Sequence, residues 1–268
     1  MHASLSVERR TEDVMVRPAP RGVRDLPPYT KNLMTAQERR RILLRDIDVV
    51  IDGGANGGQY AKWMRQCGFR GKIISFEPAS ETFDVLSEVA RSDDDWHCHN
   101  MALGPEDGQV LLHLTRTSLG SSVFRRTDLH SRVWPDDVEA GTELVPMRSL
   151  RSLWHELGCD GCRVYLKLDV EGAELSVLEG AGPFLDRIAL LELELPLVNM
   201  HHDAPAFEDV LNFLTARGFS VVALEQNHSG DDATGQMLMI DGIFRSSSAG
   251  LRGDVGFGGV RPSSKEDT

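Results

Sequence analysis

The amino-acid sequence predicts an α/β fold in which a mostly parallel sheet is covered by helices on both faces. Near-continuous apolar runs of strand length alternate with stretches of helical spacing, as expected for strands buried on both sides. A glycine-rich turn follows the first apolar run directly. Acidic or amide residues stand at the ends of several predicted strands, which is where ligands bind in open α/β sheets.

Composition favours one globular domain flanked by two tails. The chain has 268 residues, of which 41% are hydrophobic and 26% charged, which is ordinary for a globular protein. The Pro-rich segment 1–30 predicts a flexible N-terminal arm, 31–245 a single domain and the Ser/Gly-rich segment 246–268 a disordered C-terminal tail. Apolar runs stay short of the ~20 residues of a membrane span and no signal-peptide core is seen, so we expect a cytoplasmic protein.

The first predicted strand, Val49–Ile51, leads into the sequence Asp52-Gly-Gly-Ala-Asn-Gly-Gly-Gln-Tyr60 and then a helix to Cys67. Glycines let the backbone bend sharply and approach a ligand closely. Neither the Gly-Lys-Ser/Thr of a phosphate-binding loop nor the spaced glycine triplet of a dinucleotide site is present. Because Asp52 would repel a phosphate and suit a cation, S-adenosylmethionine fits, with its ammonium, sulfonium and ribose. A turn without a ligand is the alternative.

The second predicted strand, Lys72–Phe76, ends at Glu77-Pro78. An acid at the end of the second strand is where a ribose diol is held in nucleoside-binding sheets, because a carboxylate accepts from two hydroxyls at once. The same pair would also suit the start of the following helix, 80–91. A third strand, Trp96–Leu103, would bring Asn100, Met101 and Ala102 to the place where an adenine rests.

The rest of the chain supplies the remaining elements. We expect a strand at 110–115, a small polar loop at 118–122, an irregular segment at 125–147, a short helix before 154, strands at 164–168 and 188–194, helices at 173–178 and 207–217, and a final antiparallel pair at 219–224 and 236–244. Five polar residues then stand at predicted carboxyl ends: Asp52, Glu77, Asn100, Asp169 and Glu194. Their convergence predicts one shared pocket.

Six motifs follow one another in the chain: Asp-Gly-Gly-Ala-Asn-Gly-Gly-Gln-Tyr (52–60), Ser-Phe-Glu-Pro (75–78), Asn-Met-Ala-Leu-Gly (100–104), Leu-Lys-Leu-Asp-Val-Glu-Gly-Ala-Glu (166–174), Glu-Leu-Pro-Leu-Val (194–198) and Ile-Asp-Gly-Ile-Phe-Arg (240–245). In this order they resemble the FkbM family of S-adenosylmethionine-dependent O-methyltransferases, over roughly residues 40–245. Gly53 replaces the aliphatic residue usual after the Asp, and Gly58 the next small or aliphatic one. The resemblance implies the class I methyltransferase fold, which is a Rossmann-like, seven-stranded sheet with an antiparallel last strand. It also implies methylation of hydroxyls on sugars, glycolipids, polysaccharides or macrolide-type natural products.

The resemblance also assigns the cofactor contacts. Residues 52–59 would cradle the methionine part of S-adenosyl-L-methionine, Glu77 would hold the ribose, 100–102 would border the adenine, and Asp169 would lie between cofactor and acceptor. The full set of expected cofactor contacts is Asp52, Gly53, Gly54, Ala55, Asn56, Gly57, Gln59, Tyr60, Glu77, Pro78, Asn100, Met101, Ala102 and Asp169.

Methyl transfer to a hydroxyl calls for a base or a metal, because a sugar hydroxyl is a poor nucleophile. The candidate bases are Asp169, His201 and Glu194. We place Asp169 first because its strand end faces the methyl, and His201 second because histidine titrates near neutral pH; an exposed His201-His202 loop pair is the other interpretation. No metal is required by this scheme, although Asp169 and Glu194 could share a divalent cation such as Mg²⁺.

Two other functions compete with a methyltransferase. A nicotinamide-dependent oxidoreductase would have the same sheet, but the missing glycine triplet argues against it. A non-catalytic S-adenosylmethionine-binding protein would not need the acids at the strand ends. We expect a small-molecule or glycan acceptor, and neither nucleic acid nor an anionic membrane, because the net charge is −12. A homodimer is the default oligomeric state.

Overall fold

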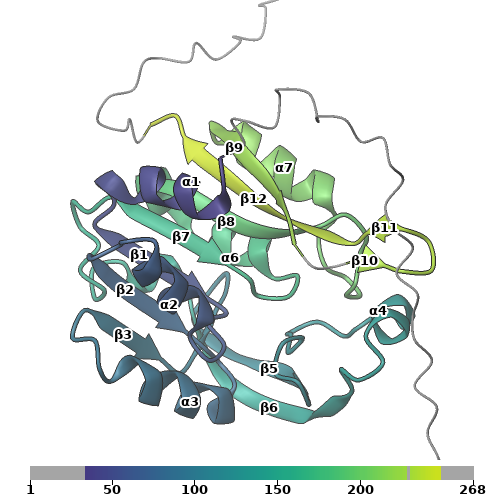
Figure 1. Ribbon diagram of the computed structural model, residues 1–268. Coiled ribbons are helices and arrows are strands. Elements are labelled where there is room, and N and C mark those ends of the chain that lie inside the picture. The colour runs from purple at the N-terminus through teal and green to yellow at the C-terminus, as the bar shows by residue number, and fades with distance from the viewer. Residues whose placement is uncertain (1–33, 228–229, 249–268) are drawn as a thin grey trace, which may run out of the picture. The chain divides into compact units, whose positions relative to one another are not determined.

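Seven strands form the central sheet in the order β3-β2-β1-β7-β8-β12-β9 (Figure 1). They are β1 (Val49–Gly53), β2 (Lys72–Phe76), β3 (Trp96–His99), β7 (Val164–Leu168), β8 (Ile188–Pro196), β9 (Phe219–Gln226) and β12 (Met239–Ser246). The structure, a computed structural model, describes residues 34–227 and 230–248. The predicted arm 1–30 and nearly all of the predicted tail 246–268 therefore lie outside the described residues.

The sheet is parallel except at β12, which pairs antiparallel with both β8 and β9. Counted in chain order within the sheet, the strands run 3-2-1-4-5-7-6, and the order reverses between β1 and β7. In sheets of this kind the crevice at the point of reversal is where ligands bind. The prediction of a mostly parallel seven-stranded sheet with an antiparallel last strand is confirmed.

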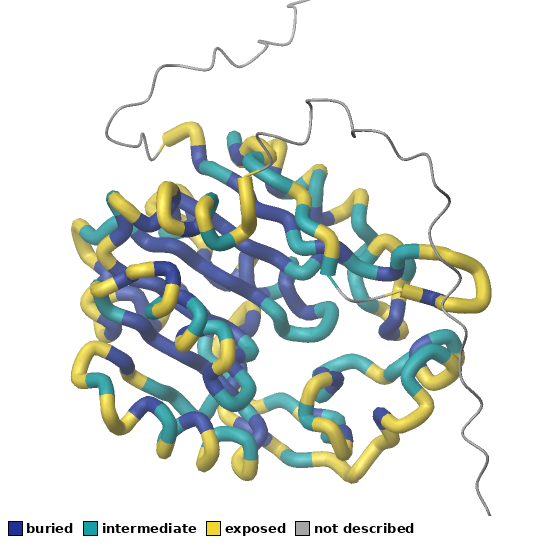
Figure 2. Tube along the Cα trace, in the orientation of Figure 1, coloured by how far each residue is buried: buried dark blue, intermediate teal, exposed yellow. Residues whose placement is uncertain are grey.

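Helices cover both faces of the sheet, as predicted (Figure 1). One face carries α1 (Ala36–Leu43), α2 (Gln59–Gln66) and α3 (Ser80–Ala90), and the other carries α5 (Leu150–Leu153), α6 (Glu174–Ala181) and α7 (Phe207–Ala216). Leu43, Met64 and Leu86 belong to the first core. Leu153, Leu178 and Leu214 belong to the second. The central strands between these cores are buried along their length (Figure 2), which explains their near-continuous apolar sequences.

A second, three-stranded sheet has the order β4-β6-β5. Its strands are β4 (Ala102–Leu103), β5 (Gly108–Thr115) and β6 (Glu139–Arg148), and the remaining elements are α4 (Asp128–Val133), η2 (Leu44–Asp46), η3 (Gly182–Arg187), β10 (Gly230–Asp231) and β11 (Gln236–Met237). Within the described part of the chain, no helix is both long and apolar enough to span a bilayer.

Two predicted segments are wrong. The single strand 96–103 is two strands in different sheets, because the side-chain amide of Asn100 donates to the backbone oxygens of Glu77 and Pro78 and turns the chain away from β3. The segment 125–147, predicted to be irregular, contains α4 and most of β6. Thr127 caps α4 by accepting from the backbone N–H of His130, and β6 pairs along its length with β5.

Candidate active site

The glycine turn after β1 lies at the point where the strand order reverses. Gly54 has φ +73°, and a side chain there would bring a Cβ to 1.8 Å from the backbone oxygen of Asp169. Gly58 has φ +82°, and its Cβ would meet the Trp96 ring at 2.7 Å. Only glycine fits both positions, so the turn packs directly against the carboxyl end of β7 and against β3.

A pocket of about 710 Å³, counting space open to solvent, lies beside this turn and is called the Glu77 pocket below. Its walls are Gly54, Asn56, Phe76, Glu77, Pro78, Met101, Ala102, Leu103, Leu112, Ser118, Leu119, Ser121, Ser122, Val123, Asp169, Val170, Glu171 and Ala173. The carboxyl ends of β1, β2 and β7 meet here with the 118–122 loop. That loop, which the sequence predicts to be small and polar, forms one wall.

Glu77 is buried at the end of β2, where its carboxylate is held by backbone groups. Oε2 accepts from the N–H of Asn56 and Oε1 from the N–H of Ala79, both at 2.9 Å. Burial raises the pKa of Glu77 to about 7, against the lowering effect of these two hydrogen bonds. Each carboxylate oxygen keeps acceptor capacity for a hydroxyl.

Seven of the residues expected to contact the cofactor line the Glu77 pocket: Gly54, Asn56, Glu77, Pro78, Met101, Ala102 and Asp169. Three of the others have different partners. Asp52 is fully buried, with Oδ1 3.6 Å from the Lys167 ammonium, so the chain itself supplies the cation that the sequence suggested a ligand would bring. The Tyr60 hydroxyl donates to Glu192 at 2.6 Å, and Asn100 holds the turn after β2. Gly53 at the end of β1, Ala55 and Gly57 in the turn, and Gln59 at the start of α2 do not line this pocket.

A second pocket of about 1120 Å³, open to solvent, adjoins the first and is called the Trp134 pocket. It is lined by Thr117, Leu119, Gly120, His130, Val133, Trp134, Pro135, Asp136, Asp137, Asp169, Glu171, Glu194 and Met239. Leu119, Asp169 and Glu171 belong to the walls of both pockets. Asp169 therefore stands at the junction of the two pockets.

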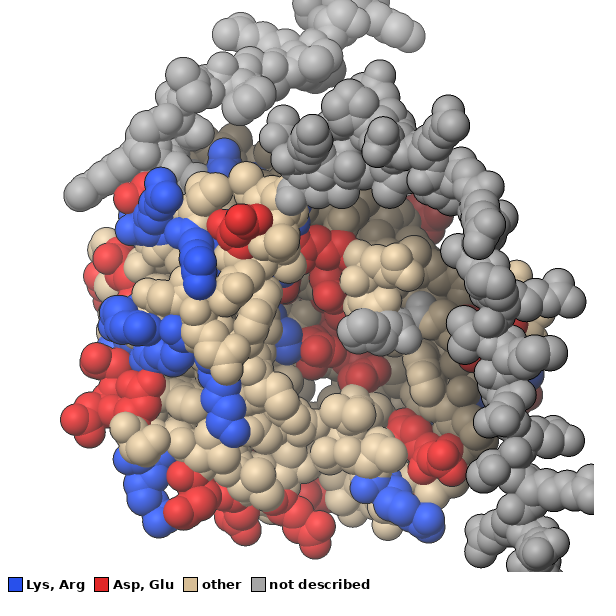
Figure 3. Space-filling view, viewed as in Figure 1, with Lys and Arg blue, Asp and Glu red and all other residues tan. Residues whose placement is uncertain are grey.

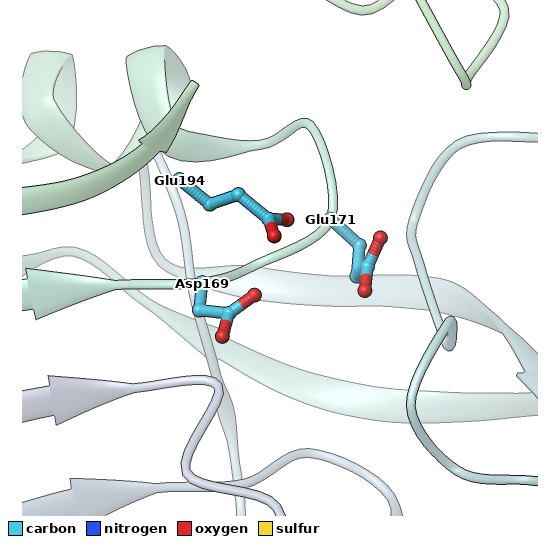
Figure 4. A group of neighbouring side chains, drawn as sticks. All are labelled: Asp169, Glu171 and Glu194. Atoms are coloured by element: carbon cyan, nitrogen blue, oxygen red, sulfur yellow. The ribbon is translucent and has the colours of Figure 1, made fainter. Parts of the chain in front are cut away.

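Three carboxylates converge at this junction, with one oxygen of each within 4.8 Å of the others. Leu168 of β7 pairs with Leu193 of β8, so the next residues, Asp169 and Glu194, lie side by side. Glu171 completes the group, and the three side chains point toward one common space (Figure 4). Acidic side chains also gather around the hollow in this face of the molecule (Figure 3). Sequence reasoning gave Glu171 no role, although it lies two residues after Asp169 in one of the quoted motifs.

His201 lies behind the junction rather than in it. It is buried in a smaller pocket of about 310 Å³ that Glu171 and Glu194 also line, called the His201 pocket. Its Nε2 is 3.9 Å from Glu171 Oε2. Burial, with the neighbouring His130 and Arg126, lowers the pKa of His201 to about 4, so the ring is neutral at physiological pH. His201 does not line the Trp134 pocket, and His202 is exposed.

Strand order, glycine turn and the acid at the end of β2 together define a class of protein. They are the features of a class I methyltransferase, whose cofactor lies across the carboxyl ends of the first strands of the sheet. The chain belongs to the FkbM methyltransferase family, since the methyltransferase FkbM domain matches residues 52–221. It is therefore a methyltransferase that uses S-adenosyl-L-methionine, and the nicotinamide-dependent alternative is set aside.

Other proteins resemble the chain more distantly. A protein of Beauveria bassiana (strain ARSEF 2860) named Methyltransferase 1 is 24% identical over 210 residues, which cover 72% of this chain and 81% of that protein. A candidate tRNA (m1A22) methyltransferase of Streptococcus pneumoniae, solved with S-adenosyl-L-methionine, has a TM-score of 0.46 and 10% identity, covering 82% of this chain and 76% of the other. The precorrin-6y C5,15-methyltransferase of Geobacter metallireducens has a TM-score of 0.39 and 14% identity, covering 81% of this chain and 92% of the other. These structural likenesses carry no information on the acceptor.

Proposed function

We propose that the protein transfers the methyl group of S-adenosyl-L-methionine to a hydroxyl of a sugar, an oligosaccharide or glycolipid, or a related natural product. The observation that carries the proposal is the position of Asp169, which lines both the Glu77 pocket and the Trp134 pocket. A methyl donor in the first pocket and a hydroxyl in the second would meet beside one carboxylate.

The Glu77 pocket suits the nucleoside part of the cofactor. Glu77 would accept the two ribose hydroxyls, and Met101 with Ala102 would border the adenine. Gly54 places backbone against the remaining part of the cofactor without a side chain in the way. With the cofactor held in this way, its sulfonium would lie toward Asp169, at the junction with the Trp134 pocket.

The Trp134 pocket suits a neutral molecule that carries many hydroxyls. Carboxylates accept from hydroxyls and repel phosphates, and this pocket has five of them, from Asp136, Asp137, Asp169, Glu171 and Glu194. The Trp134 indole and the neighbouring Val133 and Pro135 give an apolar surface on which a sugar ring can pack. A nucleic-acid acceptor would have to approach an acidic cleft on a chain of net charge −12.

Methyl transfer in this site is an in-line displacement. When bound, S-adenosyl-L-methionine would supply the methyl group. The acceptor oxygen would bond to the methyl carbon as the carbon–sulfur bond breaks, which would leave S-adenosylhomocysteine, and Asp169 would take the hydroxyl proton. The Lys167 ammonium is 3.2 Å from Asp169 Oδ2. The other carboxylate oxygen, Oδ1, is therefore available to accept the proton. Holding the two reactants in line contributes much of the rate, since effective molarities are worth about 7–11 kcal/mol.

A methyl-release assay tests the proposal. The full-length protein is incubated with methyl-labelled S-adenosyl-L-methionine and, separately, with monosaccharides, oligosaccharides, glycolipids, RNA and protein. We expect label in a carbohydrate or carbohydrate-like acceptor, in step with S-adenosylhomocysteine formation. Label only in RNA or protein would refute the acceptor class, and tight cofactor binding without transfer to any acceptor would favour a non-catalytic cofactor-binding protein.

A further inference from the structure

The junction between the pockets concentrates more negative charge than the chain neutralises. Lys167 Nζ lies 3.2 Å from Asp169 Oδ2 and 3.6 Å from Asp52 Oδ1, so this one ammonium forms ion pairs with two carboxylates. Throughout residues 34–227 and 230–248, neither Glu171 nor Glu194 forms an ion pair with a lysine or an arginine. In the described part of the chain, Glu194 receives a side-chain amide hydrogen bond from Asn227 at 3.2 Å.

Bringing these carboxylates together is costly without a counter-charge. Burial first, and then the charge of Asp169, raise the pKa values of Glu171 and Glu194 well above the ordinary range. The backbone of Glu171 is also left-handed, with φ +53°, next to Gly172 at φ +96°. A left-handed backbone at a non-glycine residue costs of order 1–3 kcal/mol and is often kept at functional sites.

A second, independent observation is the imidazole of His201. Its side chain is 4% exposed, and its Nε2 has no hydrogen-bond partner although it faces Glu171 Oε2 at 3.9 Å. A buried polar atom without a partner costs about 1–3 kcal/mol. Glu171, Glu194 and His201 all line the same His201 pocket, so this atom is directed at the carboxylate group.

The geometry points to a divalent-cation site formed by oxygens of Asp169, Glu171 and Glu194, with His201 Nε2 at its edge. Sequence reasoning offered Asp169 and Glu194 for such a site, and the structure adds the third oxygen and the imidazole. Carboxylate oxygens select Mg²⁺ and Mn²⁺, and an imidazole nitrogen among them favours Mn²⁺. His201 would either bind the ion directly or accept from water on it.

A cation at this site would lie next to the place where methyl transfer is proposed to occur. Asp169 and Glu171 belong to both pockets, so an ion held by them would lie where the acceptor hydroxyl meets the methyl donor. When bound, a divalent ion lowers the pKa of an oxygen that coordinates it. The binding site itself stands independently of whether the acceptor is a sugar.

Manganese binding to the full-length, chelator-treated protein tests the site without cofactor or acceptor. Electron paramagnetic resonance of free Mn²⁺ counts bound ions, and thermal unfolding reports stabilisation by Mn²⁺ or Mg²⁺ at constant ionic strength. We expect one ion per chain and a rise in Tm with Mn²⁺. Glu171→Gln and Glu194→Gln should each weaken Mn²⁺ binding at least tenfold and abolish the rise in Tm. Without metal, both variants should unfold at the same temperature as wild type or higher, because each removes one of the carboxylates that repel one another.

Matched variants distinguish a specific Mn²⁺ site from non-specific attraction of Mn²⁺ to acidic side chains. Asp136→Asn removes an exposed carboxylate from the wall of the same Trp134 pocket and should leave Mn²⁺ affinity unchanged. His201→Gln should weaken it about 10- to 100-fold, as outer ligand partners do. Absence of bound Mn²⁺ at 1 mM (roughly the weak end of protein cation sites), or equal affinity in wild type and in both Glu→Gln variants, would overturn the site. Either result would leave the proposed carbohydrate acceptor untested, because Mn²⁺ binding is measured without acceptor.

Discussion

Asn56 and Ser118 are hydrogen-bonded to each other in the wall of the Glu77 pocket. The Asn56 amide donates to the Ser118 backbone oxygen at 3.0 Å and to its hydroxyl at 3.2 Å. Both residues have left-handed backbones, with φ +47° and +62°, and both line the pocket. The contact fastens the 118–122 loop to the glycine turn, so it sets the shape of the cofactor site at two strained positions.

Removal of this contact should weaken cofactor binding. Asn56→Gly deletes the amide while suiting the left-handed backbone, and we expect the S-adenosyl-L-methionine Kd to rise about 3- to 10-fold, the effect of one or two net hydrogen bonds. Ser118→Gly is the matched control, because it keeps the backbone oxygen that accepts at 3.0 Å and should change Kd less. Isothermal titration calorimetry measures both, and equal effects of the two variants would show that the contact is incidental.

Cofactor affinity should depend on pH through Glu77. Its pKa is raised to about 7, mainly by burial, so the carboxyl is neutral below pH 7 and ionised above it. Ribose hydroxyls donate to the ionised form, and the competent fraction therefore grows as pH rises. We expect binding about tenfold weaker at pH 6 than at pH 8, which follows from scaling Kd by the ionised fraction.

Glu77→Gln provides the comparison for this pH dependence. Glutamine has nearly the same shape but does not titrate, so the variant should bind the cofactor more weakly at pH 8 and show a flat profile from pH 6 to 8. A wild-type Kd that stays constant over this range would contradict the ionisation of Glu77 as the cause. Titration calorimetry in buffers of matched ionic strength is the measurement.

Much of the fold can be predicted from the sequence because its central strands have apolar neighbours on both sides. β1 and β7 are buried along their whole length, so their sequences are apolar runs interrupted only near the carboxyl end, by Asp52-Gly53 in β1 and by Lys167 in β7. β6 has exposed residues over most of its length and a mixed polar sequence, and it is held chiefly by pairing with β5. Such pairing depends on distant partners, which local patterns do not reveal.

Some residues of the candidate site can likewise be predicted from the sequence, and others cannot. Asp169 and Glu194 can be found because polar residues at the ends of parallel strands meet at one edge of the sheet. Lys167 lies inside β7 in an apolar run, and its role as counter-ion to Asp52 and Asp169 depends on neighbouring strands. The place of Glu171 in all three pockets depends on a left-handed backbone that its residue type does not favour.

Trp134 should contribute to acceptor binding without affecting the cofactor. Its ring lies in the wall of the Trp134 pocket and packs edge-on against His130, with centroids 4.9 Å apart. Trp134→Ala should raise the acceptor KM about 3- to 10-fold, in line with the worth of one aromatic contact, and leave the S-adenosyl-L-methionine Kd unchanged. Trp134→Phe keeps a ring and should stay close to wild type. A parallel loss of cofactor affinity in Trp134→Ala would instead indicate that the 125–147 segment had rearranged.

Asp169→Asn should separate proton transfer from binding. Loss of a positioned base slows transfer by about 10²- to 10⁴-fold, so we expect kcat to fall in that range while the cofactor Kd changes only a few-fold. Asp136→Asn, which removes an exposed acid from the Trp134 pocket, should keep near-normal kcat at saturating acceptor, because Asp136 is not part of the Glu77 pocket wall.

Added Mn²⁺ distinguishes a lost base from a lost cation ligand at position 169. Glu194→Gln removes one carboxylate of the group and keeps Asp169, so excess Mn²⁺ should restore part of its turnover by mass action. Asp169→Asn should remain slow at any Mn²⁺ concentration, because no ion replaces the proton acceptor. Single-turnover rates measured across a Mn²⁺ series test this, and recovery of Asp169→Asn to wild-type rates would show that Asp169 acts as a ligand and that another group takes the proton.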